Sequence, residues 1–77
     1  MTLYQFILLD YGEQITTIAQ QAIYLFERTD GDYTYKLYQI DKFYIEERWH
    51  TKFNERRSFD SFNSEEKLKP YLKFINA

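Results

Sequence analysis

Acidic, basic and imidazole side chains are most concentrated in residues 46–50, Glu-Glu-Arg-Trp-His, the one stretch with the look of an active site. The surrounding pattern predicts a strand, in which successive side chains point to opposite faces of a sheet. Glu46 and His50 then share a face but lie about 13 Å apart, at about 3.3 Å per residue, too far to hydrogen-bond as an acid–base pair. Because opposite charges on neighbouring strands commonly pair, we expect solvated strand residues paired with Arg56 and Arg57.

Nucleophilic catalysis, phosphate binding and metal binding each lack the residues that they need. Ser58, Ser61 and Ser64 have no nucleophile-elbow glycines around them, and the chain has a single histidine. Gly12 and Gly31 are its only glycines, too few for a phosphate-cradling loop. The lack of cysteine excludes disulfides and thiolate metal sites. We therefore predict no catalytic residue, no cofactor, no metal site and no small-molecule substrate.

Aromatic and basic residues on one predicted sheet face suggest another chemistry, the binding of single-stranded nucleic acid. Tyrosine rings can stack on bases while arginines hold phosphates. Against this stand Glu46 in the same face, the net charge of −2 and the lack of an RNA-recognition-motif signature, because attraction to phosphate dominates such binding. The candidate interaction surface, for a protein or a nucleic acid, consists of Tyr33, Tyr35, Tyr44, Arg48, His50 and Arg57.

Four strands joined by short turns must position these side chains. Asp30-Gly31 is a strong signal for a two-residue hairpin turn, since a type I′ turn needs positive φ at both positions. Asp41-Lys42 is a weaker turn, because lysine disfavours positive φ, and residues 51–54 form a looser one. The pattern predicts a four-stranded antiparallel meander with strands at about 22–29, 32–40, 43–50 and 55–62.

The residues before this meander predict a strand and a helix. Residues 3–9 are apolar on both sides of a pleat except at Gln5, which favours a strand inside the sheet. Asp10 and Glu13 can form a capping box for a helix at about 11–20. The helix-to-strand boundary within residues 20–26 is left open.

The residues after the meander predict a turn at 64–68 and then a helix with Pro70 in its first turn. We expect that helix to pack Leu72 and Ile75 on the sheet. Residues 1–77 then form a single α+β domain in the order β-α-β-β-β-β-α, with two helices packed on one sheet face.

Both faces of the predicted sheet carry apolar residues. A two-residue loop at Asp41-Lys42 sets the register of the central hairpin. It places the pairs Ile40–Phe43 and Tyr38–Ile45 on one face, which we call the first face, and the pairs Tyr35–Arg48, Leu37–Glu46 and Gln39–Tyr44 on the other, the second face. With helices on one face, the other face or a sheet edge would pair with a second copy or a protein partner, since a lone chain rarely exposes so large a patch. The alternative is a wetter outer face of aromatic–arginine and Tyr–Gln pairs. Through the Asp30-Gly31 turn, the first face also receives Ile23 and Leu25, and the second receives Tyr24 and Phe26.

Residues 37–46, Leu-Tyr-Gln-Ile-Asp-Lys-Phe-Tyr-Ile-Glu, resemble a pattern in small uncharacterised bacterial proteins. The likeness extends to the opening Leu3-Tyr4, to Tyr24-Leu25 with Arg28, and to Pro70-Tyr71-Leu72, so that it covers most of the chain. In that group glycine often stands where this chain has Lys42, as a hairpin turn would favour. The resemblance implies this fold and a bacterial origin, and it implies no activity.

Size and composition point to association. The chain has 77 residues, near the lower limit for independent folding, and 21% of them are aromatic. With disulfides and metals excluded, self-association is the reinforcement that remains. The apolar run at residues 6–9 is too short for a signal peptide or a membrane span, so we expect a cytoplasmic protein without a membrane partner. We predict a self-associating or protein-interaction module without catalytic activity, with nucleic-acid binding as the alternative.

Overall fold

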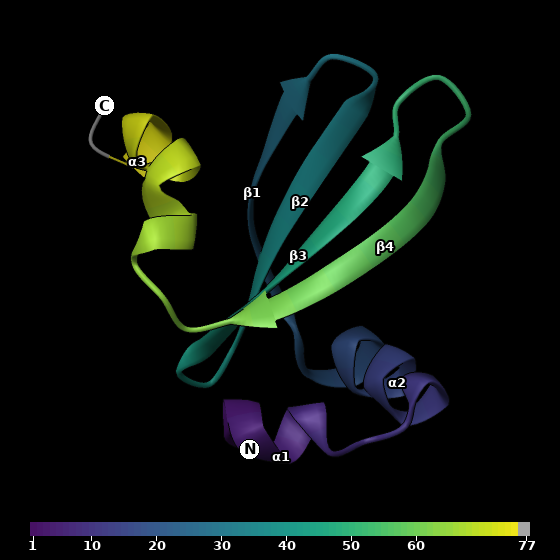
Figure 1. Cartoon of the computed structure of the whole chain (residues 1–77), viewed down its shortest axis with the longest axis vertical. Coiled ribbons are helices and arrows are strands. Elements are labelled where there is room, and N and C mark those ends of the chain that lie inside the picture. The colour runs from purple at the N-terminus through teal and green to yellow at the C-terminus, as the bar shows by residue number, and fades with distance from the viewer. Residues whose placement is uncertain (76–77) are drawn as a thin grey trace.

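The computed structural model describes residues 1–75, and the side chains of residues 1–72. An open four-stranded antiparallel sheet, in the order β1-β2-β3-β4, carries short helices at both ends of the chain (Figure 1). No helix in the described part of the chain is long and apolar enough to cross a membrane. The elements are α1 (Leu3–Ile7), α2 (Tyr11–Gln21), β1 (Ile23–Asp30), β2 (Tyr33–Ile40), β3 (Phe43–His50), β4 (Glu55–Phe62), the 3₁₀ turn η1 (Glu66–Leu68) and α3 (Lys69–Ile75).

The meander is confirmed, and β3 and β4 have the predicted bounds. Ile40 pairs with Phe43 across the Asp41-Lys42 loop, and every pair of this hairpin follows the predicted register. Asp41 has φ 51°, whereas Lys42 is not among the residues with positive φ. The left-handed position of this loop is therefore occupied by aspartate, which tolerates it better than most residues.

The first hairpin differs by one residue from the prediction. Asp30 still belongs to β1 and pairs with Tyr33, so the loop is Gly31-Asp32 rather than Asp30-Gly31. Within this loop only Gly31 has a positive φ, 61°. This agrees with a type II′ turn, which favours glycine at its first loop position.

A register shift between Tyr24 and Phe26 then reverses which side chains at the start of β1 point to each face of the sheet. Tyr24 pairs with Tyr38 on the first face, where we expected Ile23 and Leu25. Leu25 joins Phe26 in the cluster on the second face. A bulge of this kind inserts a residue without a partner, and no local pattern announces it.

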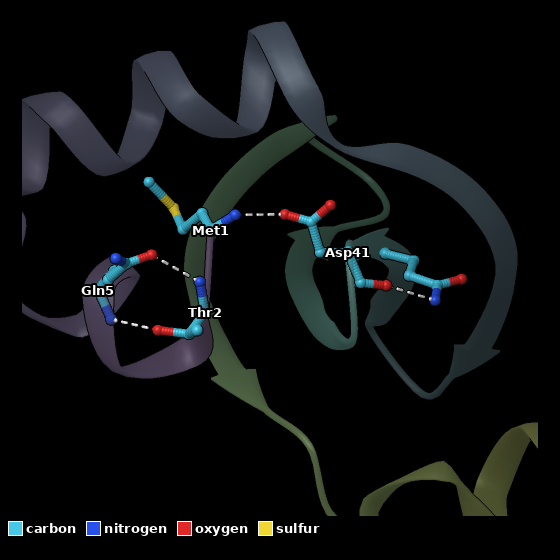
Figure 2. A network of polar contacts seen from close by, with 5 residues as sticks. Met1, Thr2, Gln5 and Asp41 are labelled. Atoms are coloured by element: carbon cyan, nitrogen blue, oxygen red, sulfur yellow. Dashed lines mark hydrogen bonds and ion pairs between the residues drawn. The ribbon is translucent and has the colours of Figure 1, made fainter.

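The predicted strand at residues 3–9 is wrong, because residues 3–7 form helix α1. Thr2 caps it: its hydroxyl accepts from the Gln5 backbone N–H at 3.1 Å, and the Gln5 side chain accepts from the Thr2 N–H at 2.9 Å (Figure 2). Asp10 and Glu13 form the predicted box at the start of α2. The observed order is thus α-α-β-β-β-β-α.

The two ends of the chain cover opposite faces of the sheet, which corrects the expectation of two helices on one face. Phe6 of α1 and Ile18 of α2 pack with Ile40, Phe43 and Ile45 on the first face. On the second face, Leu37 and Phe62 pack with Tyr71 of α3.

Tyr71 contacts the sheet from α3, and it is fully buried. Leu72, which we expected on the sheet, is exposed, and the side chain of Ile75 lies outside the described residues. Apolar residues on both faces of the sheet are thus partly covered by helices of the same chain.

Candidate functional site

Four of the six predicted surface residues do lie together, on the second face of the sheet. Tyr33 and His50 are cross-strand partners with ring centroids 5.5 Å apart, and Tyr35 pairs with Arg48 in the next row. The Arg48 guanidinium lies 4.8 Å from the centroid of the Tyr33 ring. We call Tyr33, Tyr35, Arg48 and His50 the tyrosine–arginine cluster. Its row of Tyr33 and His50 adjoins the turns at the end of the sheet away from α1 and α2 (Figure 1).

The other two predicted residues lie elsewhere. Tyr44 stacks on Phe62 with ring centroids 5.8 Å apart, in the apolar cluster that also contains Tyr71 of α3. Arg57 lies at a register irregularity of β4, and its guanidinium is 3.6 Å from the Glu55 carboxylate, not from Glu46 or Glu47.

The cluster is poorly suited to stacking nucleic-acid bases. Arg48 covers one face of the Tyr33 ring, and Arg28 lies 4.2 Å from the centroid of Tyr35. Tyr44 already stacks on a phenylalanine. A base that approached the covered face of either of the first two rings would have to displace a favourable cation–aromatic contact, so these contacts disfavour the nucleic-acid alternative.

Glu46 joins the C-terminal helix to the sheet. The Tyr71 hydroxyl donates to its Oε2 at 2.6 Å, and Arg28 Nη2 lies 3.6 Å from the same oxygen. Burial, and then the adjacent Glu46 carboxylate, raise the pKa of Tyr71 well above its ordinary value. Glu46 is therefore part of a fixed contact and not a solvated strand residue as we expected.

Glu47 is also fixed, on the first face. It is only 3% exposed, accepts from Trp49 Nε1 at 3.2 Å, and pairs with Arg56 at 2.8 Å, which confirms one predicted cross-strand pair. Burial, followed by the Glu47 carboxylate, raises the pKa of Tyr38 to about 12. Glu46 and Glu47 are thus each hydrogen-bonded and paired with an arginine, and neither is an acid–base partner of His50.

Cavities and groups of possible metal ligands are the remaining places where a binding site could lie. Residues 1–75 hold no group of three histidine or acidic residues placed to bind a metal ion. Two open depressions, of about 480 and 510 Å³, lie beside the N-terminal helices. At the larger one, the Met1 ammonium lies 2.6 Å from Oδ2 of Asp41, which ties the start of the chain to the central hairpin (Figure 2).

The outer side of the N-terminal helices carries the surface that sequence reasoning missed. Tyr4, Ile7 and Leu8 are 71%, 54% and 68% exposed. Tyr11 at the start of α2 is 66% exposed, and one face of its ring stacks on Phe59 with ring centroids 5.7 Å apart. Residues 4, 7 and 8 are helix neighbours at i, i+3 and i+4. We call these four residues the N-terminal apolar surface. The prediction of a strand hid it, although Thr2 and Gln5 have the three-residue spacing of a capping box.

Comparison of the chain with protein-family models, with curated proteins and with solved structures found no match.

Proposed function

We propose that this chain is a protein-interaction module without catalytic activity, and that it docks through the N-terminal apolar surface. One observation carries the proposal: α1 and its C-cap Leu8 carry apolar side chains on the side away from the sheet as well as on the side that faces it. Phe6 is fully buried, whereas Tyr4 and Leu8, on the opposite side, are about two-thirds exposed or more. A surface helix normally carries polar residues on the side that faces away from the core.

The size and composition of the surface support a docking role. A fully covered aromatic side chain removes about 150–250 Å² from water. With Tyr4 and Tyr11 71% and 66% exposed, their rings alone leave about 200–350 Å² accessible, and Ile7 and Leu8 add to it. Exposed apolar patches of several hundred Å² mark interaction sites in soluble proteins. Tyrosine and aliphatic residues without charges are typical of the centre of such an interface.

This proposal moves the interface away from the sheet face where we first expected it. The second face is partly covered by Tyr71 and by Leu68, which is packed against the same cluster. Its remaining surface, the tyrosine–arginine cluster, is charged. Arg48 is exposed and makes no ion pair among the described residues. The N-terminal apolar surface is the better candidate because Tyr4, Ile7 and Leu8 are exposed apolar residues with no charge among them.

Site-specific photo-crosslinking tests the proposal. A photoreactive phenylalanine analogue replaces Tyr4 in one variant and Phe53 in the other, and both are irradiated in the cells that produce the chain. Phe53 is a matched control, since it is 61% exposed but lies in the β3–β4 turn at the opposite end of the sheet (Figure 1). We expect protein adducts from position 4 and few from position 53. Equal labelling from both, or none from position 4, would refute the proposal.

A further inference from the structure

We infer that the occupant of the N-terminal apolar surface is a second copy of this chain, in a two-fold dimer that brings the two α1 helices together. The inference rests on the proposed docking function and names its partner. The charge, the symmetry and the size of the surface support it.

Charge favours a copy over a charged partner. Residues 1–9 contain no acidic or basic side chain. The Met1 ammonium is held by Asp41, and Asp10 and Glu13 are engaged in the capping box of α2. Two copies can meet through Tyr4, Ile7 and Leu8 without bringing charged side chains of residues 1–9 together, whereas a partner that uses charged contacts would find no counter-charge among these residues.

The N-terminal apolar surface is also compatible with two-fold symmetry. In a two-fold interface each residue pair occurs twice, so a single patch must be complementary to itself. An antiparallel crossing of two α1 helices, centred midway between Tyr4 and Leu8, would place Tyr4 of one copy against Leu8 of the other, and the reverse. A large ring then faces a smaller aliphatic group, as in interdigitated packing. Phe6, on the opposite side of α1, would keep its contact with Phe43, at 5.5 Å between ring centroids.

The small area of the surface indicates a weak dimer. A standard interface removes about 800 Å² from each partner. The two tyrosines contribute about 200–350 Å² per copy, and even with Ile7 and Leu8 the surface is smaller than that standard. Interfaces at this low end are weak or transient. We therefore expect a reversible dimer whose population depends on concentration.

Sedimentation equilibrium on the purified chain tests the inference, over concentrations from about one micromolar to about one millimolar, where weak complexes dissociate. Wild-type chain should shift from 9.5 kDa toward twice that mass as its concentration rises. Leu8→Lys, and separately Ile7→Lys, should raise the dissociation constant at least about tenfold, because a lysine would be buried from each copy. Phe53→Lys should not change it, since Phe53 is equally exposed but lies outside the surface. Circular dichroism of each variant reports whether its fold is retained.

Two results would overturn the inference. One is a wild-type mass of 9.5 kDa at every concentration. The other is a dimer that Leu8→Lys and Ile7→Lys leave as strong as in Phe53→Lys. A monomeric purified chain together with crosslinks from position 4 to a different protein would overturn the second copy and leave the docking function standing. The two proposals therefore fail separately.

Discussion

The hydroxyl of Tyr71 donates a 2.6 Å hydrogen bond to Glu46, a residue 25 positions earlier in the chain. Through this contact the short helix α3 is fixed to the middle of β3, on the face opposite to α1 and α2. The ring of Tyr71 is fully buried beside Leu37 and Phe62, so a polar bond and an apolar contact act at the same residue. The two contributions can be separated by substitution.

Tyr71→Phe keeps the ring and removes the bond. A hydrogen bond to a charged group contributes about 1.5–3 kcal/mol, so the free energy of unfolding should fall by about 2 kcal/mol. Urea denaturation measures the change. Tyr44→Phe is the matched control, because Tyr44 lies in the same cluster and its hydroxyl makes no hydrogen bond among the described residues. Equal losses in the two variants would show that the bond does not hold α3.

Glu47→Gln should destabilise the chain through the first face of the sheet. The Glu47 carboxylate is almost fully buried between Trp49 and Arg56, and an amide would leave part of this arrangement unpaired. We expect a loss of about 1–3 kcal/mol in the free energy of unfolding. The exposed Glu55–Arg57 pair gives the comparison, since Glu55→Gln should change stability by less than about 1 kcal/mol. Thermal or urea unfolding that ranks the two variants in the opposite order would contradict this account.

The hairpins could be predicted because their signals are local. Alternating side chains and a two-residue loop determine which residues face each other, and the register from Ile40–Phe43 to Tyr35–Arg48 follows directly. The first hairpin slipped by one residue because Asp30-Gly31 and Gly31-Asp32 both contain a turn-forming pair, and glycine at the first loop position decided between them. The bulge at the start of β1 then changed the face of Tyr24.

The helices were harder to predict, and with them the site. A short apolar run such as residues 6–9 fits a buried strand or a helix equally well, and the Thr2–Gln5 capping box was the signal in favour of the helix. The face that α3 covers depends on Tyr71 and Glu46, which no local pattern connects. Sequence alone thus brought Tyr33, Arg48 and His50 to one face, but it could not show that Tyr44 lies in the α3 cluster or that α1 exposes Tyr4 and Leu8.

The central turn should tolerate substitution at one loop position and not at the other. Asp41 has φ 51°, where a β-branched residue is strained, whereas Lys42 is exposed and has no positive φ. Asp41→Val should therefore cost about 1–2 kcal/mol in the free energy of unfolding, and Lys42→Val markedly less. Asp41→Asn removes the ion pair with Met1 but tolerates the same φ, and should cost under about 1 kcal/mol. Equal effects of the two valines in urea denaturation would contradict this explanation.

The two sides of α1 should differ in how much stability they lose on substitution by alanine. Phe6 is fully buried among Phe43, Phe59 and Ile45, so Phe6→Ala should lower the free energy of unfolding by about 3–5 kcal/mol. Leu8 is 68% exposed in the single chain, and Leu8→Ala should cost under about 0.5 kcal/mol at concentrations where the chain is monomeric. At higher concentrations the Leu8→Ala penalty should grow, since the proposed dimer would stabilise the wild-type fold by association. A penalty independent of concentration would count against a role of Leu8 in association.

Stability should fall at alkaline pH through Tyr38. Its pKa is raised from 10.0 to about 12, first by burial and then by Glu47, so the folded state holds the phenolic proton more tightly than the unfolded chain does. The contribution is fully present below pH 10 and is lost as the pH rises through the folded value, because the unfolded state then binds fewer protons. Tyr71 acts in the same direction. Urea denaturation between pH 9 and pH 11.5 should show a decline for wild type that is smaller in Tyr38→Phe. Tyr4→Phe is the control, since Tyr4 is largely exposed, and an identical decline in all three chains would show that Tyr38 does not couple folding to this titration.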